Sequence, residues 1–151
     1  MVEARSDVTI PASPAEVFES IVDLERADWL PAVRKVRHIG GTRGAVGARY
    51  EVEAGLVGRH LRGVLVCREL KPAQRMVLSL EEGLDLTIIV EITPVSGGCN
   101  VELVARYSVG GGPLSAAVER ASQGPARRET ARACEQLAAR FGRKPGARRT
   151  A

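Results

Sequence analysis

Residues 84–109 read LDLTIIVEITPVSGGCNVELVARYSV, and apolar and polar side chains alternate in both halves of this stretch. A period of two residues is typical of an antiparallel strand with one buried face. Residues 94–98 (PVSGG), between the halves, are of the types that form tight turns. The stretch therefore predicts a β-hairpin, whose apolar face carries Leu84, Leu86, Ile88, Val90 and Ile92 from the first half and Val101, Leu103, Ala105, Tyr107 and Val109 from the second.

The same alternation continues outward from this hairpin. Residues 48–56 alternate in this way, and so do residues 2–10, where Val8 and Ile10 are predicted to face inward. Residues 75–81 follow a proline-containing turn and add a further strand. We count seven strands in all.

Residues 59–70 (RHLRGVLVCREL) also predict a strand, but residues 64–67 (VLVC) are apolar on both faces, so the pattern leaves two registers open. The core-facing set is either Leu61, Leu65 and Cys67, or His60, Arg62, Val64 and Val66. In the second register, His60 and Arg62 would supply a general base and an anion-holding group inside the fold.

Two short helices are predicted after the first strand. Ser13 is placed as the N-cap of the first, with Pro14 at its first position and Glu16 completing a capping box. The apolar positions Val17, Phe18, Ile21 and Val22 then recur at helical spacing. The second helix is expected over residues 24–30.

A long amphipathic helix is predicted after residues 110–113 (GGGP). We expect Gly124 and Pro125 to kink or break it, because proline removes a helical hydrogen bond. Its apolar side is assigned to Leu114, Val118, Ala121, Thr130, Cys134, Leu137 and Phe141.

These elements predict an α+β fold. A long antiparallel sheet must cover its apolar face, and the C-terminal helix is the predicted element long enough to do so. We therefore expect a curled seven-stranded antiparallel sheet around a long C-terminal helix, with two short helices after the first strand.

The composition fits one globular domain. The chain has 151 residues, of which 44% are hydrophobic and 26% are charged. Its apolar runs are only a few residues long, so no transmembrane helix is expected. The N-terminal residues MVEARSD lack the apolar segment of a secretory signal, which favours a cytoplasmic location.

Positive charge is concentrated at the C-terminus. The formal net charge is +4, but residues 140–151 hold five basic side chains and no acidic one. We therefore divide the chain into a domain of residues 1–141 and a basic, disordered tail of residues 142–151. The remainder is close to neutral, so nucleic acid is not an expected partner, whereas weak contact of the tail with an anionic membrane surface is one hypothesis.

The sequence offers few groups for catalysis. Three cysteines without a CxxC spacing and two histidines predict no metal site, and we expect no cofactor. No GxSxG elbow or phosphate-binding loop is present. Hydrolase and redox functions are therefore disfavoured, and no catalytic residue is assigned.

Several segments resemble the START-like (SRPBCC) superfamily, which includes polyketide cyclases, dehydrases and lipid-transport proteins and has the helix-grip fold. The resemblance extends over residues 2–141, and its motifs are architectural. They are residues 8–18 (VTIPASPAEVF), 23–25 (DLE), 29–31 (WLP), 67–72 (CRELKP) and 91–103 (EITPVSGGCNVEL).

In that superfamily the sheet and the long helix enclose an apolar cavity for a polyketide, lipid, quinone, sterol or hormone. The resemblance implies such a cavity here, with Leu65 and Cys67 facing inward and Trp29 bordering the mouth. A low aromatic content of 3% and many small inward residues agree with an incompletely filled interior, although a helix settled on the sheet would close it. The candidate ligand-binding residues are Trp29, Tyr50, Val52, Leu65, Cys67, Leu78, Leu86, Ile88, Leu103, Tyr107 and Val118.

Three functions are compatible with this scaffold. The first is binding of a hydrophobic small molecule by a polyketide cyclase/dehydrase-like protein, with cofactor-free cyclisation as its chemistry, where an inward phenol of Tyr50 or Tyr107 would hold a carbonyl or assist enolisation. The second is a non-catalytic carrier of a lipid or quinone, similar to the coenzyme Q-binding branch. The third is a regulatory interaction protein.

Overall fold

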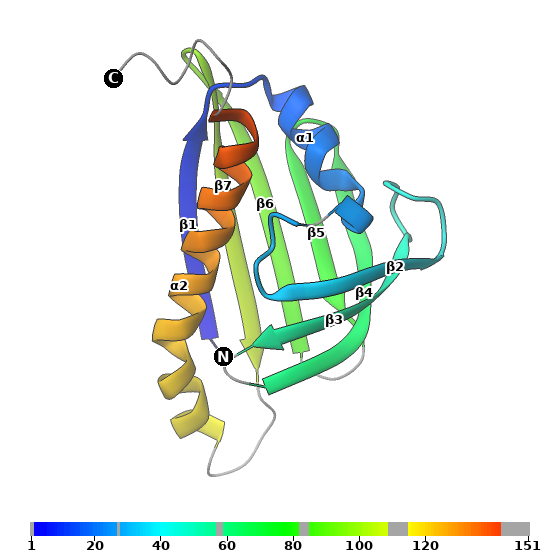
Figure 1. Cartoon of the computed structure of the whole chain (residues 1–151), viewed down its shortest axis with the longest axis vertical. Coiled ribbons are helices and arrows are strands. Elements are labelled where there is room, and N and C mark those ends of the chain that lie inside the picture. The colour runs from blue at the N-terminus through cyan, green and yellow to red at the C-terminus, as the bar shows by residue number, and fades with distance from the viewer. Residues whose placement is uncertain (1, 27, 57–58, 82–84, 109–114, 143–151) are drawn as a thin grey trace.

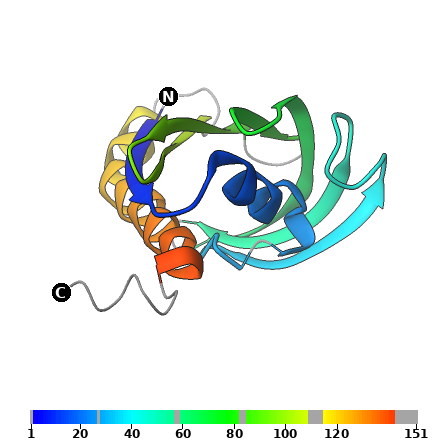
Figure 2. The ribbon, with the colours of Figure 1, turned by 90° about the horizontal axis from the view of Figure 1, so that it is seen from above.

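The computed structural model describes residues 2–26, 28–56, 59–81, 85–108 and 115–142. Within these residues, seven antiparallel strands form one sheet in the order β1-β7-β6-β5-β4-β3-β2. The sheet curls, and the helices lie on its concave side (Figures 1 and 2). The elements are β1 (Val2–Ile10), α1 (Pro14–Val22), the 3₁₀ turn η1 (Leu24–Arg26), β2 (Val33–Gly40), β3 (Arg49–Leu56), β4 (Arg59–Lys71), β5 (Arg75–Leu80), β6 (Asp85–Val95), β7 (Gly98–Ser108) and α2 (Ser115–Gly142).

The hairpin predicted from residues 84–109 is β6 and β7. Ile88 pairs with Ala105 and Val90 with Leu103, so the two apolar rows share the concave face. β1 adds to the other side of β7, where Val8 lies opposite Val101. The predicted positions Leu84, Val109 and Leu114 lie outside the described residues.

The sheet ends in two edge strands, β1 and β2. The range of β2 was not predicted from the sequence, because its apolar positions are interrupted by basic ones. β2 instead pairs with β3 through an irregular register, with shifts between Val33 and Lys35 and between His38 and Gly40. Exposed charged residues on an edge strand oppose pairing with another chain.

The register of β4 is ambiguous in the sequence because Val66 is buried on the convex face while its neighbours Leu65 and Cys67 are buried on the concave face. Leu65 and Cys67 belong to the buried core, which confirms the first of the two registers. Between Cys67 and Glu69 the pairing with β5 shifts by one residue, so that Leu70 also packs against the core. No single alternation therefore describes the whole strand.

Helix α1 begins as predicted. The Ser13 hydroxyl accepts a hydrogen bond from the backbone N–H of Glu16 (3.2 Å), and the Glu16 carboxylate accepts one from the N–H of Ser13 (3.2 Å). Among the described residues of the predicted range 24–30, only Leu24–Arg26 is helical, as a 3₁₀ turn, so the second helix is shorter than predicted. The Glu25 carboxylate of that turn accepts a hydrogen bond from the backbone N–H of His38 on β2 (3.0 Å). The spacing of residues along the chain does not predict this tertiary contact.

Helix α2 is continuous through Pro125, so the predicted break is wrong. Thr130, Cys134 and Leu137 are buried as predicted, but Val118 is 44% exposed and Ala121 is also exposed. The helix instead packs through a row that includes Ser122. Ser122 and Thr130 can be buried in this row because their hydroxyl groups form hydrogen bonds within the helix. Ser122 donates to the Val118 carbonyl (2.7 Å) and Thr130 to the Ala126 carbonyl (3.1 Å).

The convex face of the sheet has its own apolar stripe. Val66, Ile89 and Val104 are buried there, although both helices lie on the other side (Figure 1). Ion pairs, most of them between neighbouring strands, also lie on this face, and the aliphatic parts of long charged side chains cover such surfaces. The pairs are Arg5–Glu102, Arg106–Glu3, Arg75–Glu69, Arg75–Glu91, Arg49–Glu81, Arg68–Glu81 and Arg37–Glu51.

The start of β7 gives a test of the packing between β1 and β7. A Cβ at Gly98 would overlap the carbonyl oxygen of Ile10. We therefore expect Gly98→Ala to lower the free energy of unfolding by about 2–4 kcal/mol in urea titrations, because the backbone must shift. Gly124→Ala, inside α2 with only an ordinary contact to Arg128, should be neutral or stabilising by up to about 1 kcal/mol. Equal effects would contradict this packing.

Candidate functional site

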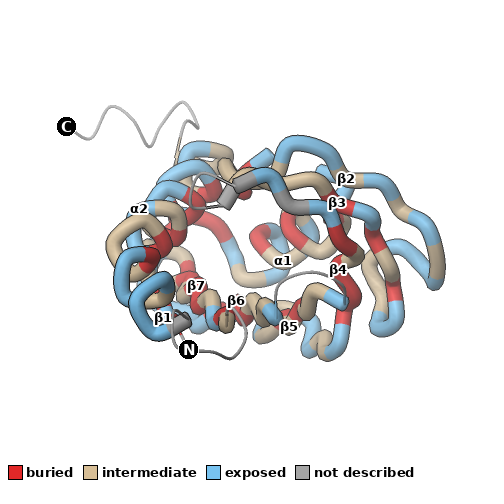
Figure 3. The backbone as a smooth tube through the Cα atoms, turned by 90° about the horizontal axis from the view of Figure 1, so that it is seen from below, coloured by how far each residue is buried: buried red, intermediate tan, exposed pale blue. Residues whose placement is uncertain are grey.

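A cavity that is partly open to solvent lies between α2 and the concave face of the sheet. Its volume is about 120 Å³. The buried positions of α2 face the inside of the curl (Figure 3). Residues 30–32, which precede β2, and Val33, its first residue, form a further part of the wall. The helix contributes Ala126, Glu129, Thr130 and Ala133.

Small side chains leave this space. Ala54 and Gly63 line it from β3 and β4, Ala105 from β7, and Ala126 and Ala133 from α2. Larger aliphatic residues complete the sheet side of the wall. Because protein interiors otherwise pack at the density of organic crystals, opposed small residues keep the helix and the sheet from filling the gap.

Six of the eleven predicted ligand-binding residues line the cavity. They come from β3, β4, β6 and β7, where alternation identified the concave face. They are Val52, Leu65, Leu86, Ile88, Leu103 and Tyr107.

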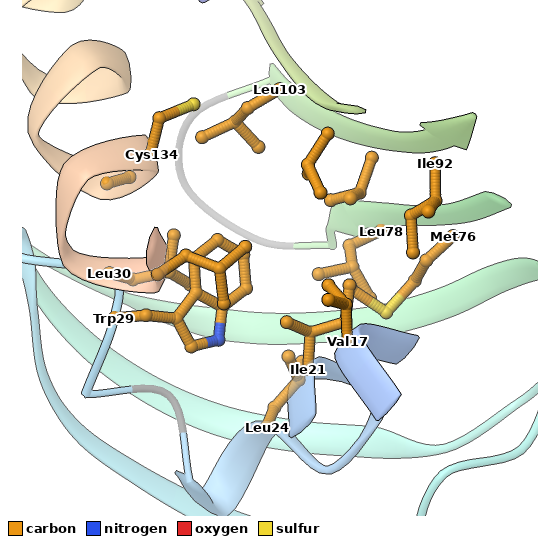
Figure 4. Packing of buried hydrophobic residues seen from close by; sticks show 14 of the residues in the cluster. Val17, Ile21, Leu24, Trp29, Leu30, Met76, Leu78, Ile92, Leu103 and Cys134 are labelled. Atoms are coloured by element: carbon orange, nitrogen blue, oxygen red, sulfur yellow. The ribbon is translucent and has the colours of Figure 1, made fainter. Parts of the chain in front are cut away.

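Four predicted residues belong to the hydrophobic core but do not line the cavity: Trp29, Tyr50, Cys67 and Leu78. They share a hydrophobic cluster with Val17 of α1, and Figure 4 shows Leu78 on the side of the cluster that faces α1. The short helix thus occupies one end of the sheet and leaves the other end to α2.

Trp29 does not border the cavity mouth, as the resemblance implied. Its side chain is 2% exposed, and it lies beside Leu30 near α2 (Figure 4). The cavity wall begins one residue later, at Leu30. Val118, the eleventh predicted residue, is exposed on α2 and is not part of the wall.

Both tyrosine hydroxyls already have partners. Tyr50 accepts the N–H of Gly44 (3.1 Å) and so holds the β2–β3 loop, while Tyr107 donates to the carbonyl of Ser122 in α2 (3.3 Å). Burial raises the pKa of both phenols. Raised pKa values make them weaker acids, which lowers their value as proton donors.

The histidine–arginine pair considered for the other β4 register is not assembled in the cavity. His60 lies 3.3 Å from the Glu53 carboxylate on the convex face. Arg62 also has an exposed side chain, but it does form part of the cavity wall. Only one member of the pair therefore reaches the site.

Glu129 is a wall residue that the sequence does not predict, because a charged residue in an amphipathic helix is normally assigned to solvent. Arg62 faces the core only in the β4 register that the structure does not adopt, yet it still forms part of the wall. The small residues were easier to find, because Ala54 and Ala105 fall on the predicted inward faces.

An arginine clasp fixes the C-terminal end of α2 over the fold. Arg140 donates to the carbonyl of Ser20 (2.9 Å) at the end of α1 and to the carbonyl of Arg26 (2.6 Å) in η1, and it pairs with Asp28. Its partial burial lowers its pKa. The clasp joins the three segments that cover the sheet, so Arg140 belongs to the domain and not to the tail.

Membrane-spanning helices and metal-ligating clusters are both absent from the described residues. No helix there has the length and apolar character needed to span a bilayer. No cluster of three or more histidine, cysteine, aspartate or glutamate side chains is placed there to hold a metal ion.

The description "Polyketide cyclase / dehydrase and lipid transport" belongs to a family model that matches residues 1–142. The chain belongs to this family. The match spans the whole domain, from β1 to the end of α2. No curated protein matches the chain.

Solved structures of other proteins share the fold. The protein TTHA0849 from Thermus thermophilus has a TM-score of 0.79 at 20% identity, covering 92% of this chain and 96% of its own. A START superfamily protein from Mycobacterium smegmatis has a TM-score of 0.73 at 11% identity, covering 92% and 96%. The di-domain ARO/CYC BexL from the BE-7585A biosynthetic pathway has a TM-score of 0.67 at 23% identity, covering 91% of this chain and 46% of that one. At these identities the likeness concerns the fold.

The buried thiol of Cys134 predicts that the stability of the folded protein depends on pH. Burial raises the pKa of its thiol from the ordinary value of 9.0 to about 11. Above pH 9 the unfolded thiol releases its proton while the folded thiol keeps it, so the folded state binds more protons and loses stability as pH rises. The contribution is fully present below pH 9 and decreases between about pH 9 and 11, by roughly 2–3 kcal/mol.

Urea titrations at pH 7, 9 and 11 would measure this loss. We expect Cys134→Ala to have a shallower decline of unfolding free energy than the wild type between pH 9 and 11. The other buried thiols and phenols remain in both proteins, so the difference between the two curves isolates Cys134. Parallel curves would contradict the assignment.

Proposed function

We propose that this protein binds an apolar small molecule in the cavity between α2 and the sheet. The observation that carries the proposal is a cavity of about 120 Å³ whose wall is mostly aliphatic. An apolar, concave interior with few polar groups is typical of small-molecule sites. Membership of a family described by cyclase, dehydrase and lipid transport agrees with this function.

The size of the cavity limits the ligand class. An engineered protein cavity of roughly 150 Å³ holds benzene. A cavity of about 120 Å³ therefore accommodates one ring or a short aliphatic segment. A quinone-like ring or part of a lipid chain fits this description better than a folded polyketide.

The polar groups of the wall favour binding without catalysis. Cyclisation requires a group that exchanges protons with the substrate. Tyr107 donates its hydroxyl proton to a backbone carbonyl, and burial raises its pKa, so it is a poor acid. We therefore prefer a carrier or binding protein to a cyclase.

Native mass spectrometry of protein purified from its own host tests this proposal. We expect a stoichiometric quinone, lipid or other small apolar ligand after denaturing extraction. A polycyclic aromatic product would favour the cyclase function instead. Protein that is empty and gains no thermal stability from any of these compounds would contradict small-molecule binding and favour the interaction-protein function.

Filling the cavity should abolish binding without unfolding the protein. Ala105 lies on the sheet side of the wall, and Leu at this position would project into the space. We expect Ala105→Leu to weaken binding of ethylbenzene at least tenfold in calorimetric titrations, with thermal unfolding still cooperative. Val118→Leu, at an exposed position of α2, should bind as the wild type does. Unchanged affinity in Ala105→Leu would place the ligand elsewhere.

The basic C-terminal residues suggest how a carrier would meet a membrane. Residues 143–151 contain four basic side chains and no acidic one, and without them the net charge of +4 falls to zero. Each basic residue near an anionic surface contributes about 1 kcal/mol. We expect deletion of residues 143–151 to abolish sedimentation with phosphatidylserine-containing vesicles at low salt. Unchanged sedimentation would remove the support for membrane loading.

A further inference from the structure

The solvent-exposed residues of α2 between positions 116 and 128 are all arginines or apolar residues. They are Ala116, Ala117, Val118, Arg120, Ala121, Arg127 and Arg128. Val118 is 44% exposed, and no acidic residue of this segment belongs to the exposed set. These seven residues are called the outer face of α2 below.

The other polar side chains of the same segment are held by the sheet or by the helix itself. The Glu119 carboxylate accepts a hydrogen bond from the hydroxyl of Ser108 on β7 (3.3 Å). Gln123 donates to the backbone carbonyl of Glu3 on β1 (2.7 Å), and Ser122 is buried. The segment therefore turns polar groups toward the sheet and apolar groups toward solvent, which is the reverse of the usual arrangement on a surface helix.

Charge is also distributed unevenly between α2 and the rest of the domain. α2 contains five arginines and three glutamates, whereas residues 1–142 as a whole have a net charge of zero. The remainder of the domain is therefore net negative. The exposed side of α2 faces away from the sheet (Figure 3), so the positive charge is presented on one side of the molecule.

An anionic lipid surface matches both properties of the outer face of α2. Guanidinium groups form charge-assisted hydrogen bonds with the phosphates and carboxylates of lipid headgroups, and apolar side chains between them enter the headgroup boundary. A nucleic acid would bind the arginines in the same way, but it would leave Val118 and the alanines against a hydrated phosphate backbone. A second copy of this face would bring arginines against arginines. The mixed composition therefore favours a membrane.

We propose that the outer face of α2 is a docking surface for membranes that contain anionic phospholipids. Arg120, Arg127 and Arg128 bind the headgroups, and Val118 contacts the boundary between headgroups and acyl chains. The inner side of the same helix covers the cavity, where Ala126 forms part of the wall. Docking thus places the helix that covers the cavity against the lipid. This surface goes beyond the proposed binding function and lies in the domain, apart from the basic C-terminal residues.

Sedimentation of the full chain with vesicles at low salt tests the proposal. Vesicles of phosphatidylserine and phosphatidylcholine are compared with vesicles of phosphatidylcholine alone. The variant Arg127→Gln/Arg128→Gln removes two charges from the outer face of α2. The matched control Lys35→Gln/Lys71→Gln removes two charges from exposed positions on β2 and β4. Every variant keeps residues 143–151, and thermal unfolding reports whether each one folds.

We expect Arg127→Gln/Arg128→Gln to weaken binding to the anionic vesicles about thirtyfold, which corresponds to about 1 kcal/mol for each arginine. The lysine variant should lose less than about threefold, because its charges lie away from the docking surface. Val118→Asn keeps every charge and should still weaken binding about threefold, because a polar side chain gains less at the headgroup boundary. No variant should bind vesicles of phosphatidylcholine alone.

Equal losses in the arginine and lysine variants would overturn the docking surface, because net charge alone would then explain binding. Unchanged binding by the arginine variant would also overturn it and would assign the membrane contact to residues 143–151. Wild-type binding by Val118→Asn would overturn the apolar contact. Binding to a DNA duplex that depends on Arg127 and Arg128, without binding to the anionic vesicles, would replace the membrane by a nucleic acid. No cavity ligand is used, so these outcomes are separate from those for small-molecule binding.

Discussion

The need to cover one apolar sheet face organises this molecule. Two helices of different composition divide the concave face. α1 inserts the large side chains Val17 and Ile21 at one end, and these pack in the hydrophobic core with Leu78, which does not line the cavity. α2 presents Ala126 and Ala133 at the other end, where the cavity lies. The position of the cavity thus follows from which helix carries the small residues.

Hydrogen bonding inside the fold keeps the cavity apolar despite several polar side chains around it. Ser122 and Thr130 bond to carbonyls of their own helix, and Tyr107 bonds from the sheet to α2. Arg140 uses backbone carbonyls to hold the end of α2 against α1 and η1. Since these groups are satisfied within the protein, the wall presents few positions that can recognise a polar group of a ligand.

Sequence pattern predicted the fold well and the site in part, for physical reasons. Alternation identifies which face of a strand is buried, so Val52, Ile88 and Leu103 were found. It does not report which helix covers that face, so it places Leu78 in the cavity, whereas Leu78 packs in the hydrophobic core with Val17 of α1 and does not line the cavity. Apolar residues were preferred for the packed row of α2, so Val118 was chosen over Ser122, whose hydroxyl is satisfied locally.

The ion pairs on the convex face join the strands without using the side chains that line the cavity. Pairs such as Arg5–Glu102 and Arg75–Glu91 join adjacent strands from outside, and they involve no residue of the cavity wall. Residues on the concave side can therefore change in size with little effect on how the strands are joined. Such independence allows a curled sheet of this kind to change its ligand through interior substitutions while its strands stay joined as before.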